Sequence, residues 1–469
     1  MPSSLRDPPP DHAFAAGFLP AGHVLAGTGP SFLLDRVAHQ RLRSVAPAPK
    51  RIAVTSRRVL PLLLRRPFID HTATRGLLFA LPILLCFAPL AASWALPLVT
   101  LAIIWQAHEE DVLAVGTALA EGWAWYPLLV VLAASSLWAL DRQAALLLAA
   151  RVAGLILCAI LLAGTLRRLA PTLLDGLLTA LGWGMAAAAF VVAADLAAGT
   201  PLIRLLHGAA SLVPPADAYS RGAVFQAIAT VPLALALWRN GRRRLAVGQL
   251  VLVALAAGLG VQAAAKLALL CGMAAGATVL VWPALRWLPP VTIVIFAIAL
   301  PWALPISPSP ETTCWLAEHK PSGLHRVLIW NWVDARIREK PALGWGLDAS
   351  RRMPGGTEHV AVRGCDDPPD RLPRLDNEVL PLHPHDAALQ IWLELGGLGI
   401  AAAAAAVAST AAGAFRRWRG RDAAPLAAML SASAAAALLS FGIWQEWWLA
   451  SLGLAAGIAI AATRAIRPP

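Results

Sequence analysis

Residues Pro381 to Gly399 read P-L-H-P-H-D-A-A-L-Q-I-W-L-E-L-G-G-L-G, at the point where a long polar segment gives way to an apolar helix. Such a change indicates a membrane surface. We expect two histidines, Pro384 and Asp386 in the first helical turn, where the missing N–H of a proline is tolerated. The positive helix N-terminus favours a neutral imidazole there, whereas Asp386 favours the charged form. The stretch therefore predicts a basic imidazole held at a membrane edge.

The composition of the whole chain is that of a membrane protein. Hydrophobic residues make up 58% and charged residues 14% of the 469 positions, and the mean hydropathy is +0.63. Apolar runs near the ~20 residues that cross a bilayer recur along most of the chain. The net charge of +12 does not indicate a nucleic-acid partner, because the basic residues lie in short runs between apolar segments. These observations predict an all-α polytopic membrane protein.

Apolar segments alternate with basic clusters. The apolar segments are 76–105, 123–140, 144–164, 172–196, 222–238, 245–260, 262–283, 289–305, 385–412, 424–442 and 446–464. The basic clusters are 167–168, 239–244, 286, 416–421 and 464–467. The first apolar segment is either one tilted helix or a hairpin of two. Only a hairpin puts every cluster on the side of the basic N-terminal residues, so the positive-inside rule predicts about 12 transmembrane helices with both termini cytoplasmic.

This topology divides the chain into four parts. Residues 1–75 are rich in Pro and Arg and are expected to form a disordered cytoplasmic tail. The other parts are 76–305 with transmembrane helices 1–9, a large extracytoplasmic loop at 306–384, and 385–469 with helices 10–12. Tryptophans at span ends, such as Trp444, Trp447 and Trp448, are expected to be ordinary membrane-interface anchors.

The loop 306–384 is expected to be partly structured. Residues 324–340 predict an amphipathic helix along the bilayer surface. Its apolar face is expected to comprise Leu324, Leu328, Trp332 and Ala335, with Val327 and Ile337 nearby. Met353 to Leu375 are expected to be irregular.

Two of the five cysteines, Cys314 and Cys365, lie in this loop. An oxidising compartment would favour a disulfide between them, and the alternative is two unrelated thiols.

Polar groups from distant segments are expected to converge on the loop side of the membrane. Arg221 begins one span, Gln262 and Lys266 lie near the junction of two others, and His385 begins the span after the loop. A charge inside an apolar run, as at Lys266, is costly and often functional. This convergence is the strongest physical indication of a site.

Three ordered motifs carry a family resemblance. They are H-R-V-L-I-W at 325–330, P-A-L-G-W-G-L at 341–347 and H-P-H-D-A-A-L-Q-I-W-L-E-L-G-G-L-G at 383–399. They resemble the O-antigen ligase and polymerase superfamily. That family has an Arg-x-x-x-Trp helix and a Pro-x-x-Gly-x-Gly turn in a large periplasmic loop, followed by His-Asn/Ser-x-x-Leu-x-x-x-x-Glu-x-Gly. The resemblance covers roughly residues 120 to 466.

The resemblance implies a metal-independent, cofactor-free glycosyltransferase of lipopolysaccharide biosynthesis, with a C-type, all-helical fold in the bacterial inner membrane. Such an enzyme moves a glycan from an undecaprenyl-pyrophosphate carrier to a lipid or glycolipid acceptor at the periplasmic face. The implied partners are therefore this donor, the acceptor and membrane lipids. The leading hypothesis is an O-antigen ligase, whose acceptor is lipid A–core or a related glycolipid, and the alternative is an O-antigen or exopolysaccharide polymerase. The sequence does not determine the sugars or the oligomeric state.

The family histidine corresponds to His385, followed by Asp386 where Asn or Ser is usual. A neutral His385 would act as general base toward an acceptor hydroxyl. By position alone it could equally be an interfacial histidine that caps a helix. His383 lies one step further out and is expected to orient the turn. Together the two histidines resemble part of a metal site, but no third ligand has a recognisable spacing, so we expect no metal.

The family arginines are expected to hold the pyrophosphate, because a guanidinium binds phosphate bidentately. The loop arginine corresponds to Arg326, in a motif that Trp330 closes. Arg221 is the nearest candidate for the membrane-edge arginine, and Gln262 or Lys266 for the motif of the next span. Without the resemblance, Arg326 could merely extend from an amphipathic helix, and Arg221 could be a topological flank.

A function from another class is a polytopic transporter or lipid flippase. Transporters place polar groups near the bilayer midplane between repeated halves. The chain has no convincing internal repeat, and its polar groups gather at one face, which favours the enzyme.

Overall fold

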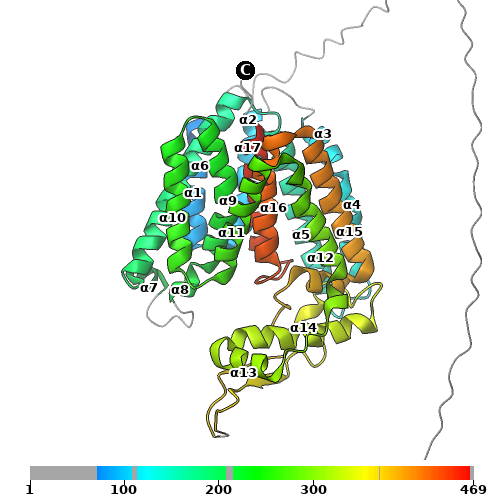
Figure 1. Ribbon diagram of the computed structural model, residues 1–469. Helices are drawn as coiled ribbons and strands as arrows, with labels where there is room; N and C mark the ends of the chain where they lie inside the picture. Colours follow the sequence, from blue (N-terminus) through cyan, green and yellow to red (C-terminus); the bar gives the residue numbers. More distant parts are fainter. Residues whose placement is uncertain (1–70, 108–113, 208–214, 369, 465–469) are drawn as a thin grey trace, which may run out of the picture. The chain divides into compact units, whose positions relative to one another are not determined.

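The computed structural model describes residues 71–107, 114–207, 215–368 and 370–464. Most of the expected tail, residues 1–70, lies outside this part of the chain. The described residues form an all-α polytopic membrane protein with one small β-hairpin (Figure 1).

The elements follow one another in a single up-and-down bundle with one large insertion. The bundle helices are α1 (His71–Phe87), α2 (Ala92–Ala107), α3 (Ala114–Glu121), α4 (Tyr126–Ser135), α5 (Arg142–Leu166), α6 (Pro171–Ala197), α9 (Ser220–Arg239), α10 (Arg243–Leu259), α11 (Ala263–Val281), α12 (Leu288–Ala299), α15 (Ala387–Arg417), α16 (Ala424–Ala437) and α17 (Glu446–Arg464). Short helices α7 (Pro201–His207) and α8 (Pro215–Ala218) connect α6 to α9. The insertion holds α13 (Pro310–His319), α14 (Pro321–Glu339), β1 (His359–Val362) and β2 (Leu375–Glu378).

Each predicted apolar segment contains at least one bundle helix, but the number of spans remains a prediction. Among the described residues, eight helices are long and apolar enough to cross a membrane, or nine when the bent pair formed by α3 and α4 counts as one span. Helices α1, α10 and α16 have only 17, 17 and 14 residues. The expected total of about 12 therefore requires that these three shorter helices also cross.

The first apolar segment is a hairpin, as the charge pattern predicted. Helix α1 ends just before Ala88, whose backbone is non-helical (φ −135°, ψ 67°). The following Pro89 disfavours the helical conformation at that position. Gln106 Nε2 donates a hydrogen bond to Thr74 Oγ1 (3.0 Å), so the end of α2 lies beside the start of α1.

Basic clusters from distant parts of the chain meet at one end of the bundle, which we call the basic end. Arg239 pairs with Asp422 (3.5 Å), and Arg464 donates to the Leu169 carbonyl (3.2 Å). The basic end comprises Arg75, Arg167, Arg168, Arg239, Arg242, Arg286, Arg417 and Arg464. Since the N-terminal turn of α1 also lies here, the clusters and that turn share one end, as the positive-inside rule requires.

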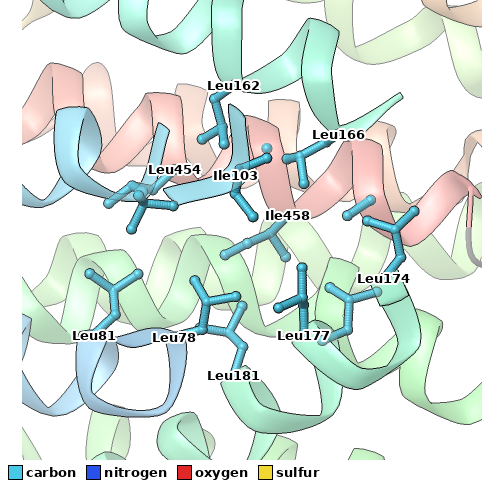
Figure 2. A pocket seen from close by; sticks show the side chains of 14 residues that line it. Leu78, Leu81, Ile103, Leu162, Leu166, Leu174, Leu177, Leu181, Leu454 and Ile458 are labelled. Atoms are coloured by element: carbon cyan, nitrogen blue, oxygen red, sulfur yellow. The ribbon is translucent and has the colours of Figure 1, made fainter. Parts of the chain in front are cut away.

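A small apolar cavity lies between α1, α2, α5, α6 and α17 (Figure 2). Its volume is about 40 Å³, and its lining residues are all apolar. Leu166 and Leu174 place it in the half of the bundle near the basic end. A cavity of this kind stays dry, and none of its lining residues belongs to the predicted site.

The loop helix α14 forms as expected, but only part of its predicted apolar face is buried. Leu324 is 7% exposed, whereas Leu328 is 37% exposed and Ala335 is also exposed. The buried side chains include Ile329, Val333 and Ile337, which join a core cluster with residues of α15. The reason is that α14 packs across the start of α15, so its contacts with protein decide which face is buried.

The rest of the insertion is more regular than expected between Met353 and Leu375. β1 pairs antiparallel with β2, with His359 opposite Glu378 and Val362 opposite Leu375. A disulfide joins Cys314 to Cys365, whose Cα atoms lie 5.4 Å apart. Figure 1 shows this subdomain outside the bundle, beside the end at which α15 begins.

Helix α15 is broken at Gly396, and the P-A-L-G-W-G turn fits into the break. Gly396 has φ 63° and ψ −161°, a conformation that only glycine adopts readily. The peptide groups freed by the break bond to the turn. The bonds are Trp345 N to Leu393 O (2.9 Å), Gly346 N to Glu394 O (2.8 Å), Gly397 N to Pro341 O (2.8 Å) and Leu398 N to Ala342 O (3.1 Å). Two of the three sequence motifs are therefore one interlocked structure, which ties the loop to the bundle.

Candidate functional site

Helix α15 begins after the histidines. Asp386 is its N-cap, with an extended backbone and with Oδ1 accepting from Leu389 N (2.9 Å). The prediction that the histidines, Pro384 and Asp386 occupy the first turn is therefore wrong. The physical reason is that the Asp386 side chain satisfies an N–H that has no intrahelical partner, so the helix starts at Ala387.

Aspartate at position 386 is compatible with capping, although the family that the motif resembles usually has Asn or Ser there. All three residue types are strong N-caps. Asp386 can therefore cap the helix as Asn or Ser would.

A pair of variants tests this role. Asp386→Ala is expected to cost about 1 kcal/mol of stability, whereas Asp386→Asn is expected to cost a few tenths. Thermal unfolding of the two purified variants in detergent measures the difference. Equal losses in both variants would contradict a capping role.

The two histidine rings pack edge to face with centroids 4.4 Å apart. His385 has φ 56°, a left-handed conformation that is uncommon for residues other than glycine and that recurs at functional sites. His385 N donates to His383 Nδ1 (3.2 Å), so His383 helps to hold the backbone of His385. The orienting role expected of His383 remains a prediction, and this contact is the one through which it would act.

The tautomer of His385 follows from its partner. Its Nδ1 lies 2.9 Å from the carbonyl oxygen of Ser440. Because a carbonyl only accepts, Nδ1 carries the proton, and the lone pair of a neutral ring is then on Nε2. The ring is oriented to receive a proton at Nε2.

Burial favours the neutral form of both imidazoles. It lowers the pKa of His383 to about 3, and its electrostatic interactions with His385, Arg351 and Arg326 lower it further. Burial also lowers the pKa of His385, where the bond to the Ser440 carbonyl opposes the effect and Arg326 adds to it. The sequence left open whether the helix N-terminus, which favours a neutral imidazole, or Asp386, which favours a charged one, has the larger effect on His385. In the structure, burial has the largest effect on the pKa of His385.

The Asp386 carboxyl is itself buried, and burial raises its pKa to about 7 against the opposing backbone hydrogen bonds from Leu389 and Ala388. Its side chain is directed to the helix N-terminus. It therefore does little to favour a charged His385.

Arg326 lies on α14 and is half-buried. Burial lowers the pKa of its guanidinium, and its charge acts on both histidines. Trp330, one turn later, donates Nε1–H to the Pro384 carbonyl (2.9 Å). This bond fastens the loop helix to the histidine turn, so the structure brings Arg326, Trp330 and His385 together.

The remaining predicted residues border residues 438–445, the segment between α16 and α17 that we call the connector. Gln262 Nε2 donates to Ser440 Oγ (3.1 Å), and Lys266 follows one turn later on α11. Arg221 lies over the ring of Trp447, 5.4 Å from its centroid. Gln262 therefore bonds the side chain of Ser440, the residue whose carbonyl bonds His385. Arg221 lies on α9 and Lys266 on α11, two neighbouring helices.

The cations near the site differ in whether they have an anionic partner. Within the described part of the chain, Arg326, Arg221 and Lys266 form no hydrogen bond or ion pair. Neighbouring arginines are paired: Arg351 with Asp348 (3.1 Å), Arg352 with Asp141 (3.0 Å) and Arg151 with Glu446 (2.8 Å). A half-buried guanidinium without a partner is unfavourable by itself, and a bound anion would relieve that cost.

Two features of the site escaped the sequence reasoning. Ser440 orients His385 through a main-chain carbonyl, which no side-chain pattern identifies. The tryptophans at 444, 447 and 448 are 5%, 4% and 0% exposed, so the expectation that they are membrane-interface anchors is wrong. They pack inside the protein, where Trp447 supports Arg221.

The described residues contain no group of three or more His, Cys, Asp or Glu side chains that would hold a metal ion. His383 and His385 therefore have no third such ligand in this part of the chain.

Residues 209–404 match the family model for O-antigen ligase. A protein of Rickettsia typhi named "Putative polysaccharide ligase" is 33% identical over 140 residues, which are 28% of this chain and 30% of the relative. Proteins of the same name from Rickettsia prowazekii and Rickettsia bellii are both 31% identical, over 28% and 31% of this chain and 30% and 33% of their own lengths. The chain thus matches about a third of the length of these curated relatives.

Proposed function

We propose that this chain, whose residues 209–404 match the family model for O-antigen ligase and which is similar to proteins named polysaccharide ligases, is a membrane glycosyltransferase of that family. The proposed reaction moves a glycan from an undecaprenyl-pyrophosphate carrier to a lipid or glycolipid acceptor, such as lipid A–core. We place this reaction at the periplasmic face of the bacterial inner membrane, with both termini cytoplasmic. The observation that carries the proposal is a buried histidine with Nε2 as its acceptor atom, beside a half-buried arginine that has no anionic partner among the described residues.

In this mechanism His385 Nε2 takes the proton of the acceptor hydroxyl. The hydroxyl oxygen attacks C1 of the donor sugar, a new C1–O bond forms, and the bond from C1 to the pyrophosphate oxygen breaks. The pyrophosphate leaves with the bonding electrons. In-line attack of this kind inverts the configuration at C1. A positioned general base typically contributes about 10²- to 10⁴-fold to the rate.

The growing negative charge on the pyrophosphate needs cations that have no other partner. In the described part of the chain Arg326 meets this requirement beside His385, and Arg221 and Lys266 extend the positive charge along the bundle. A guanidinium offers two parallel N–H donors to a phosphate. Stabilisation is strongest where charge develops in the transition state, in a site from which water is partly excluded. We expect no metal ion or other cofactor to take part.

The experiment that tests this proposal uses purified protein in one detergent phase, with undecaprenyl-pyrophosphate-linked glycan and candidate acceptors, with and without EDTA. We expect glycan to move onto the lipid or glycolipid acceptor at the same rate in both conditions. Loss of activity with EDTA would contradict a metal-independent reaction.

The products distinguish the rival functions. Longer carrier-linked glycan instead of acceptor-linked glycan would indicate an O-antigen or exopolysaccharide polymerase. Absence of any transfer would contradict the enzyme and leave the transporter or flippase as the alternative, because a single detergent phase has no second compartment.

A further inference from the structure

Glu394 on α15 is 0% exposed, and among the described residues it forms no ion pair. Its carboxylate instead accepts hydrogen bonds from several uncharged donors. They are Asp348 N (2.8 Å), Ser350 N (3.4 Å), Ser350 Oγ (2.5 Å), Gln390 Nε2 (3.0 Å) and Trp444 Nε1 (2.9 Å). A buried carboxylate without a cation is costly unless its oxygens are satisfied. The free energy of this site therefore depends on all three segments that supply the donors.

One of these segments is the connector, which orients His385. Gln390 donates to Glu394 and accepts from Ile443 N (2.8 Å) through Oε1. Trp444, the next residue, bonds to Glu394 directly. Ser440 lies three residues before Ile443, and its carbonyl receives His385 Nδ1–H. Hydrogen bonds thus hold residues 443 and 444 to Glu394, and the backbone from 443 to 440 connects them to the carbonyl that bonds the imidazole.

The second segment is the turn at 348–351. Glu394 holds Asp348 and Ser350 by three hydrogen bonds. Arg351 follows immediately, and its charge acts on His383, the residue that accepts the backbone N–H of His385. The Glu394 carboxylate therefore holds both segments that act on the histidine pair, which are the connector and the turn at 348–351.

We propose that Glu394 is a positioning residue of the site, which sets the orientation of His385 through the connector and the place of the 348–351 turn beside His383. The inference rests on the proposed function for its effect on rate. Glu394 touches neither histidine, so it acts through Gln390, Trp444 and Ser350.

Glu394→Gln is the informative variant. Oε1 accepts three of the hydrogen bonds and Oε2 accepts two, so an amide NH₂ in either place faces at least two donors. We expect kcat to fall about 10- to 100-fold, as for small misplacements of a catalytic group, with KM within about threefold. We also expect faster amide hydrogen exchange in 344–351 and 438–445. Glu339→Gln, which changes an exposed partner of Arg336 on α14, is the matched control and should alter neither readout.

Trp444→Phe and Ser350→Ala keep the test decisive if Glu394→Gln does not fold. Each removes one side-chain donor and is expected to give smaller changes in the same direction. Unchanged exchange in both segments would overturn the inference, and so would faster exchange with an unchanged kcat. Failure of the proposed function is recognised separately, as a wild-type protein that transfers no glycan. The exchange data then decide alone whether Glu394 holds the two segments.

Discussion

Replacing His385 with alanine is expected to lower the rate of glycan transfer by about 10²- to 10⁴-fold, the usual contribution of a general base. The structure gives the physical reason, because Nδ1 is occupied by the Ser440 carbonyl and Nε2 is the only ring atom left to accept a proton. Initial rates in detergent with carrier-linked glycan measure the effect. His359→Ala, at an exposed histidine of β1, is the matched control and should keep the wild-type rate. A His385→Ala variant within about threefold of wild type would rule out this base.

The pH dependence gives a second readout for the same residue. Burial lowers the pKa of His385 from its ordinary 6.5, so the neutral form predominates at pH 6.5 and above and is lost in more acidic solution. We expect kcat/KM to fall on acidification with a midpoint below pH 6.5. Burial raises the pKa of Asp386 to about 7, and its titration could overlap. The same profile is therefore expected in Asp386→Asn, and a midpoint above 6.5 in that variant would contradict the assignment.

Gly396→Ala is expected to destabilise the protein by about 2 to 5 kcal/mol, from a left-handed alanine together with overpacking. A Cβ at this position would lie 2.5 Å from the carbonyl carbon of Ala342. The interlock between the P-A-L-G-W-G turn and the break in α15 could not close around it. Because this interlock ties the loop to the bundle, transfer activity should fall together with the unfolding temperature.

Gly413→Ala is the matched control on the same helix. A Cβ there meets nothing within 4 Å, and alanine favours a helix by about 0.5 to 1 kcal/mol over glycine. Gly344→Ala should behave like Gly396→Ala, since its Cβ would lie 2.5 Å from Glu394 C. Equal unfolding temperatures for Gly396→Ala and Gly413→Ala would contradict the interlock.

Much of the fold could be predicted because its determinants are local. Hydropathy located the bundle helices, since crossing a bilayer requires apolar runs of a given length. The positions of basic residues predicted the α1–α2 hairpin, because Lys and Arg are enriched in the loops on the cytoplasmic side of a membrane protein. The motifs indicated His385, Arg326 and Trp330, which the structure brings together through the bond from Trp330 to the Pro384 carbonyl.

Other features depended on contacts between distant residues, so only the tertiary structure decided them. The buried face of α14 is set by α15, which follows α14 only after a long segment that contains β1 and β2. The neutral state of His385 is due to burial, and its tautomer is due to a main-chain carbonyl 55 positions away. Hydropathy and spacing describe neighbours along the chain, and they carry no information about which main-chain oxygen meets an imidazole. For the stretch from Pro381 to Gly399, the sequence determined that a histidine lies where a membrane helix begins. The tertiary structure determined that this histidine precedes the helix, has a pKa lowered by burial, and carries its free lone pair on Nε2.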